Sequence, residues 1–108
     1  MSFVPRSPLD DLEARLEEAV ALMDRCREPY WSRRLSMALV QVRANRLAGV
    51  SQVLGTFGGE GTLSDLEVLA DERERDPRRH ALENRRLQTL RDSLFRLADG
   101  ISNATARS

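Results

Sequence analysis

Hydrophobic residues recur at intervals of three and four over most of the chain, which is the spacing of one face of an α-helix. The first such stripe lies within residues 8–26. Ser7 suits the N-cap, Pro8 the first helical position and Asp10 the N3 position, so the sequence predicts a helix that begins at Pro8. The apolar stripe of this helix consists of Leu9, Leu12, Leu16, Ala19, Met23 and Cys26.

A proline marks the start of a second helix. Glu28 precedes Pro29, and the residue before a proline is pushed out of the helical region, so the first helix ends there. We expect the second helix to run from Pro29 to about Arg46. Its buried stripe is predicted to be Trp31, Leu35, Ala38, Leu39 and Val42.

Shorter elements are predicted in the middle of the chain. Ala48 and Gly49 indicate a tight corner, and a short helix over residues 50–57 then ends at a run of glycines. After the glycines, Thr62 and Asp65 resemble a second capping box, which favours a short helix carrying Leu63, Leu66 and Leu69. The alternative is a brief extended piece over residues 66–69.

The last helix is predicted after residues 71–79, a mixed charge run typical of a solvated loop or an exposed helix end. Asp76 and Pro77 can cap this helix, and Gly100 is expected to stop it. Its heptad-like stripe, which we expect to pack against the first two helices, consists of Leu87, Leu90, Leu94, Leu97 and Ile101.

These patterns together predict one domain over residues 1–108. The fold class is all-α, a compact bundle of four to five helices with a glycine-rich inter-helix loop. Residues 1–7 and 102–108 are expected to be loose arms.

Three of the six glycines, Gly58, Gly59 and Gly61, fall within four positions of a chain that otherwise has helical patterns. Glycine adopts positive φ at little steric cost, so this segment is predicted to form a defined bend, a binding loop or both. A phosphate loop is disfavoured because no Gly-Lys-Ser or Gly-Lys-Thr follows, and Glu60 would repel an anion. A tight inter-helix connection and a specific ligand or partner contact both remain open.

Composition narrows the classes of function. All seventeen basic residues are arginine, which either GC-rich coding or selection for bidentate contacts with carboxylate or phosphate would explain. Seventeen acidic residues bring the net charge to zero, which argues against a nucleic-acid-binding protein. The chain has no apolar run near the ~20 residues of a membrane span and no secretory signal, so we expect a cytoplasmic protein.

Few side chains in the sequence are suited to metal binding or catalysis. Cys26 and His80 are the only strong sulfur and nitrogen ligands, fewer than the three or four of a zinc site, so no metal or cofactor is predicted. We expect Cys26 to be a small core residue and His80 to face solvent; a nucleophilic pair of the two would lack a third, orienting group. Glu60 and Asp65 are better placed, beside the loop, for acid–base work or an oxygen-liganded cation.

Trp31, the run from Phe57 to Gly61 and the pair Asp65–Leu66 resemble a family of small bacterial proteins of unknown function. In that family a tryptophan on an early helix precedes a Phe-Gly-Gly-Met-Gly-Ser-like loop and Asn-Asp-Leu, and a later asparagine, here Asn84, opens a leucine-rich helix. The resemblance covers about residues 31–97. This chain departs from the pattern at three positions, with Glu60 for methionine, Thr62 for serine and Ser64 for asparagine. The resemblance implies a bacterial cytoplasmic protein and supplies no activity.

The favoured hypothesis is a non-enzymatic protein-interaction module that presents its glycine loop to a protein partner. A small-ligand binder or enzyme using Glu60, Asp65 and Asn84 is the first alternative, and a nucleic-acid accessory protein is the second. Self-association through surplus apolar surface is compatible with all three. The candidate binding residues are Trp31, Phe57, Gly58, Gly59, Glu60, Gly61, Thr62, Ser64, Asp65 and Asn84.

Overall fold

The computed structural model describes residues 7–58 and 61–107. The all-α class is confirmed, because no strand occurs in these residues. The elements are the α-helices α1 (Pro8–Arg25), α2 (Pro29–Arg43), α3 (Leu47–Leu54) and α4 (Pro77–Ala106), and the 3₁₀-helices η1 (Leu63–Asp65) and η2 (Ala70–Glu72). None of the helices described is both long enough and apolar enough to cross a membrane.

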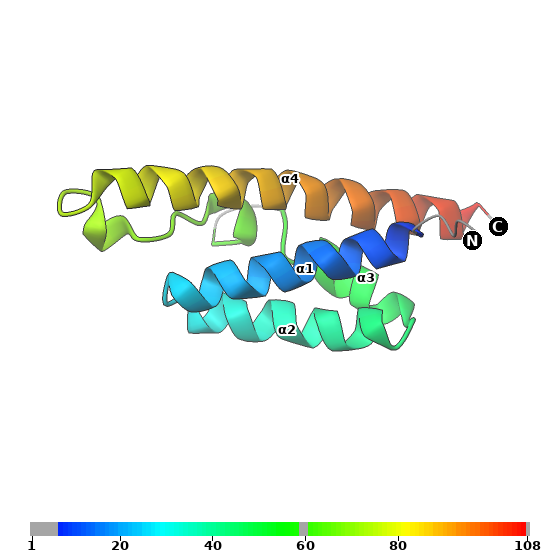
Figure 1. The fold of residues 1–108 in the computed structure, drawn as a ribbon. Coiled ribbons are helices and arrows are strands. Elements are labelled where there is room, and N and C mark those ends of the chain that lie inside the picture. Colours follow the sequence, from blue (N-terminus) through cyan, green and yellow to red (C-terminus); the bar gives the residue numbers. More distant parts are fainter. Residues whose placement is uncertain (1–6, 59–60, 108) are drawn as a thin grey trace, which may run out of the picture.

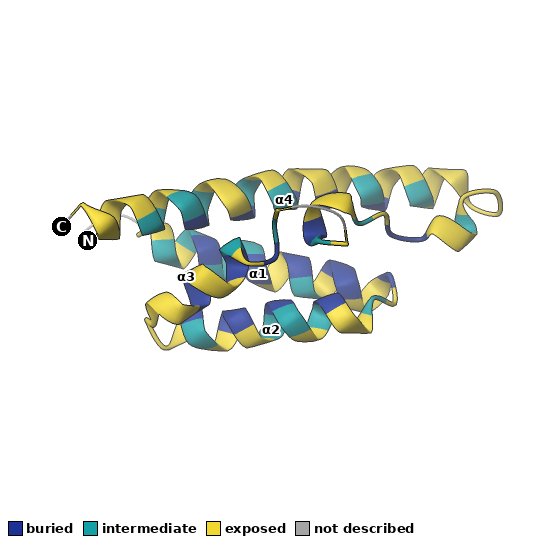
Figure 2. Cartoon of the chain, turned by 180° about the vertical axis from the view of Figure 1, so that it is seen from behind, coloured by how far each residue is buried: buried dark blue, intermediate teal, exposed yellow. Residues whose placement is uncertain are grey.

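Figure 1 shows α1 between α2 and the much longer α4, with both neighbours running antiparallel to α1. Residues 61–76 run back along α4 before the chain turns into that helix (Figure 1). All four α-helices supply fully buried side chains to one core, for example Leu16, Leu35, Val53 and Leu94. Figure 2 shows the buried positions on the sides of the helices that face one another.

The start of α1 is as predicted. Asp10 N–H donates to the Ser7 hydroxyl at 3.1 Å, and Ser7 N–H donates to the Asp10 carboxylate at 3.2 Å, which completes the capping box. α2 ends at Arg43, three residues earlier than expected. Asn45 takes a left-handed conformation with φ 57°, and Arg46 N–H donates to the Gln41 carbonyl at 2.9 Å, so the backbone closes the helix there.

The predicted corner at Gly49 is wrong, because this residue lies inside α3 and is buried. A Cβ atom at this position would lie 2.7 Å from Cγ2 of Val42 and 2.9 Å from the Ala38 carbonyl oxygen. The glycine therefore allows α3 to pack directly against the backbone of α2. α3 consequently begins at Leu47, before the predicted start at residue 50, and it ends at Leu54, before the glycine run.

The predicted short helix over residues 63–69 is reduced to the single 3₁₀ turn η1, and no side chain caps it at Thr62. The backbone is extended at Leu66 and left-handed at Leu69, with φ 57°. The carbonyls of Leu63, Ser64 and Leu66 and both backbone groups of Val68 bond to side chains of α4, described below. The amides of Asp65 and Leu66 make only the short turn hydrogen bonds to Thr62 and Leu63. This competition with α4 explains why the helical spacing of the leucines does not produce a helix.

α4 begins as predicted, with the Asp76 carboxylate accepting from Arg79 N–H at 3.1 Å. The expected stop at Gly100 is wrong, since the helix continues to Ala106 and includes most of the predicted C-terminal arm. Ala98 is buried and Ile101 packs on the core, so contacts on both sides of Gly100 favour continued helix. The other predicted arm lies, apart from Ser7, outside the described residues.

Candidate functional site

The two ends of the glycine segment are joined by a backbone hydrogen bond. Leu63 N–H donates to the carbonyl of buried Thr56 at 2.8 Å, and the Thr56 hydroxyl donates to the Val53 carbonyl at 2.6 Å. Gly58 and Gly61 have φ of +116° and +74°, the positive values that the glycine content predicted. The two described ends of the segment are therefore held together. Gly59 and Glu60, two of the candidate residues, lie outside the described residues.

An open groove of about 810 Å³ lies between this segment and α4. Two aromatic rings meet in it: the ring centroids of Phe57 and Phe95 are 5.4 Å apart, and the rings are inclined by 70°. Phe95 is 46% exposed although it is large and apolar. The groove is lined by Leu54, Phe57, Gly58, Ser64, Gln88, Arg91, Asp92, Phe95, Arg96 and Asp99.

Arg91 of α4 holds in place the wall of the groove that lies opposite α4. Its Nη1 donates to the carbonyl oxygens of Leu63, Ser64 and Leu66 at 3.0–3.1 Å, and its Nη2 donates to the side chain of Gln88 at 2.5 Å. A charged donor shared by three carbonyls is a strong restraint on a short irregular segment. The wall that carries Ser64 is consequently tied to α4, the helix that carries Phe95.

Charged side chains of both signs surround the aromatic centre of the groove. Arg91 and Arg96 are interspersed along α4 with Asp92 and Asp99. The Asp92 carboxylate accepts from the Gln88 amide at 2.9 Å, which orders one side of the rim. An apolar centre with aromatic anchors and a polar rim is the usual anatomy of a protein–protein contact.

The structure brings only part of the predicted site together. Phe57, Gly58 and Ser64 line the groove, whereas Thr62 and Asp65 do not. Asp65 is the last residue of η1 and is exposed.

Trp31 belongs to the core and not to the groove. The guanidinium carbon of Arg34 lies 5.4 Å from the centroid of its ring, and Arg34 Nη2 donates to the Gly55 carbonyl at 3.3 Å. The tryptophan therefore supports the backbone that leads into the glycine segment through Arg34, which stacks on its ring in a cation–π contact and donates the hydrogen bond to Gly55.

Asn84 anchors the segment before η2 to α4. Its Oδ1 accepts from Val68 N–H at 3.0 Å, and its Nδ2 donates to the carbonyls of Val68 and His80 at 2.9 and 2.8 Å. An asparagine amide offers one carbonyl and two N–H donors, and all three groups are used here. Asn84 therefore has a structural role in this fold and does not line the groove.

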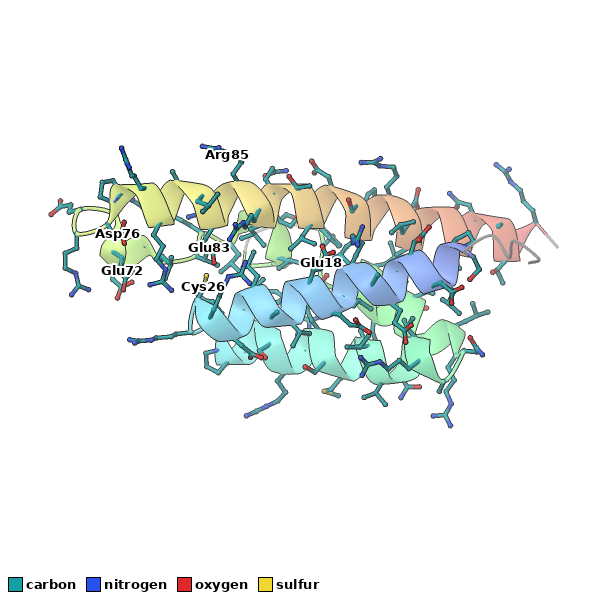
Figure 3. All side chains as sticks on the ribbon, in the orientation of Figure 1. Glu18, Cys26, Glu72, Asp76, Glu83 and Arg85 are labelled. Atoms are coloured by element: carbon teal, nitrogen blue, oxygen red, sulfur yellow. The ribbon has the colours of Figure 1, made fainter. Side chains whose placement is uncertain are left out.

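Sequence reasoning missed a buried ionic cluster between α1 and α4. Glu83 is only 3% exposed; its carboxylate accepts from Arg25 Nε and Nη2, from Arg86 Nη1 at 2.8 Å and from the Cys26 thiol at 3.5 Å. Figure 3 shows Glu83 and Cys26 facing each other between the two helices. The hydrogen bond from Arg25, above all, lowers the pKa of Glu83 to about 2. The sequence signal for the burial of Glu83 is its position one helical turn before Leu87, on the apolar stripe of the last helix.

Cys26 and His80, the two candidate nucleophile and ligand side chains, contact different partners. Cys26 is buried as expected, and desolvation together with the nearby Glu83 carboxylate raises the pKa of its thiol to about 11, so it is protonated at neutral pH. His80 is half-buried, and its Nε2 lies 2.7 Å from Glu67 Oε2, which corrects the expectation that it faces solvent. Within residues 7–58 and 61–107, no three His, Cys, Asp or Glu side chains are arranged to hold a metal ion.

Comparison with known proteins finds no relative of this chain: no protein-family model, no curated protein and no solved structure matches it. The resemblance seen in Trp31, the glycine run and Asn84 stays a prediction. The groove and the other surfaces of the fold are therefore the basis for a functional proposal.

Proposed function

We propose that this protein is a non-enzymatic protein-interaction module whose contact surface is the groove between the glycine segment and α4. The observation that carries the proposal is Phe95, a large aromatic side chain that stays 46% exposed beside Phe57. Aromatic residues, phenylalanine among them, are enriched at protein interfaces relative to the rest of the surface. On the resemblance described above, we place the protein among small bacterial cytoplasmic proteins.

Rigidity of the groove supports binding. Arg91 ties three carbonyls of one wall to α4, and the hydrogen bond between Thr56 and Leu63 closes the glycine segment. A surface that is already ordered loses little conformational entropy when a partner binds. By contrast, the amide of Asn84 is fully used in the fold, and the net charge of zero offers no general attraction for nucleic acid. The interaction hypothesis is therefore better supported than either alternative.

The lining of the groove also defines the kind of partner. Its centre, with Phe57 and Phe95, accommodates an apolar side chain, and its rim presents Arg96 and Asp99 to charges of either sign. A protein segment with one aliphatic or aromatic anchor flanked by polar residues fits this pattern.

Affinity capture from native lysate tests the proposal with the variant Phe95→Ala. The matched control is Leu82→Ala, since Leu82 is also an exposed apolar residue of α4, at 42%, and does not line the groove. We expect a stoichiometric protein partner with the unchanged protein and with Leu82→Ala, and its loss with Phe95→Ala. Equal capture by both variants, with circular dichroism spectra that show both folded, would contradict the proposal.

A further inference from the structure

α2, together with its C-cap residue Ala44, has a second line of residues with helical spacing, on the side away from the core. Tyr30, Arg33, Met37, Val40 and Ala44 follow one another at intervals of three, four, three and four, and all five are exposed. We call these five residues the outer seam. Spacing of this kind places them on one face of the helix, as in the contact face of a helix pair.

The outer seam exposes more apolar surface than a solvated helix needs. Tyr30, Met37 and Val40 are 61%, 57% and 59% exposed, and they make up three of the six large exposed hydrophobic residues in the described part of the chain. The opposite face of α2 packs on α1 and α3. Figure 2 shows exposed positions recurring along α2 among the buried ones. Clustered exposed apolar side chains mark interaction surfaces, whereas scattered ones do not.

The stretch of chain that carries the outer seam has charged residues of one sign only. Residues 29–59 contain four arginines and no aspartate or glutamate. Arg43 is bound by Glu13 and Glu17 of α1, at 3.4 and 2.9 Å. Arg33, within the seam itself, forms no hydrogen bond or ion pair with any other residue that the structure describes. The seam therefore joins an apolar stripe to a cation without a carboxylate partner.

We propose that the outer seam binds an amphipathic α-helix of a partner protein, which has an apolar stripe at the same spacing and a carboxylate opposite Arg33. The seam extends from Tyr30 to Ala44, which is about 21 Å or four turns at 1.5 Å per residue, so the partner helix has a similar length. Apolar contact supplies the attraction, and pairing with Arg33 fixes the register, as a single polar position does in coiled coils.

A second copy of this chain is a poorer occupant. α2 contains no acidic residue, so antiparallel pairing of two outer seams about Met37 would place Arg33 against Val40 of the other copy without a carboxylate. Covering an unpaired charge is costly. An anionic membrane is disfavoured because Glu13 and Glu17 lie beside Arg43 and would repel acidic lipid.

This proposal goes beyond the groove. The outer seam shares no residue with it, and Figure 1 shows α1 lying between α2 and α4. A protein with both surfaces can hold two partners at once. Loss of binding at the groove would leave the outer seam untouched, so the two proposals fail independently.

Selection from a display library of helical peptides tests the outer seam. The peptides have apolar residues at three–four spacing, and the remaining positions vary among Glu, Lys and Ala. We expect the selected binders to be enriched in Glu and to lose affinity at least about tenfold on the double variant Met37→Ser/Val40→Ser. Arg33→Glu should weaken the same peptides, and replacing their Glu opposite Arg33 by Lys should restore binding to that variant.

Arg85→Glu is the matched control for charge, because Arg85 is an exposed arginine of α4, and Phe95→Ala is the control for the groove. Neither variant should change the affinity of the protein for the selected peptides. Peptides without charge preference, or peptides that bind the double variant equally well, would overturn the proposal. A dimer seen in sedimentation velocity that the double variant abolishes would also overturn the proposal. Binding to phosphatidylglycerol vesicles that the double variant abolishes would do the same.

Discussion

Glu83 is a charged residue in an environment far from the water that a carboxylate prefers. It is buried between α1 and α4, and it stays ionised because Arg25 and Arg86 donate to its two oxygens. Removing one partner of a buried ion pair leaves the other charge unsatisfied. Glu83 should therefore be a determinant of stability, although no functional hypothesis depends on it.

We expect Glu83→Gln to lower the free energy of unfolding at pH 7 by on the order of 2 kcal/mol, a value moderated because Arg25 is 42% exposed. The folded-state pKa of about 2 lies below the usual 4.5, so the stabilisation is complete above about pH 4.5 and is lost as pH falls towards 2. Urea unfolding measured across this range should show a shallower acid decline in the variant. Glu18→Gln, which breaks an exposed pair with Arg15, is the control and should change little.

The Cys26 thiol should react slowly with a thiol reagent. Its pKa is raised to about 11 and its side chain is buried, so neither thiolate nor access is available at pH 7.5. We expect labelling in the native state to be at least about tenfold slower than in urea. Equal rates in the two conditions would show that the cluster around Glu83 opens readily.

The groove residues differ in how far the sequence could predict them. Phe57, Gly58 and Ser64 could be identified because glycine clusters are visible in the sequence. Phe95 and Arg91 could not, because their place opposite the glycine segment depends on how α4 packs. The sequence predicts Trp31 and Asn84 as binding residues, but their contacts belong to the core and to the segment before η2.

At the scale of elements, two glycines inside helices give opposite expectations for the same substitution. Gly100→Ala should stabilise the protein by about 0.5–1 kcal/mol, since the space around it is open and alanine favours helix. Gly49→Ala should destabilise it by about 1–3 kcal/mol, because the new Cβ would lie 2.8 Å from the Val42 amide nitrogen. Thermal unfolding of both variants measures the contrast, and a change of the same sign in both would contradict this account of α3 packing.

Local signals located the beginnings of helices better than their ends. Ser7 and Asp76 form caps with their own neighbours, so the starts of α1 and α4 follow from short sequences. The ends depend on packing: α4 continues past Gly100 because Ala98 and Ile101 contact the core. The glycine in α3 could not be distinguished from a turn glycine, because only the approach of α2 explains it.

The whole molecule should unfold as one unit, because buried residues of α1, α2, α3 and α4 form one core cluster. Trp31, the only tryptophan, reports on α2, whereas far-ultraviolet circular dichroism is dominated by α4, the longest helix. We expect the two signals to give the same urea midpoint. Midpoints that differ reproducibly would show that α4 separates from the rest before the core unfolds, and would contradict the single-domain prediction.

The order of the helices along the chain has a consequence during synthesis. α1, α2 and α3 leave the ribosome first and can pack locally, since neighbouring helices contact one another. Until α4 emerges, the side of α1 that α4 later covers has no neighbour, and Glu83 has not yet reached Arg25 and Cys26. The nascent chain thus presents an apolar face with an unpaired arginine, the kind of surface on which chaperones act.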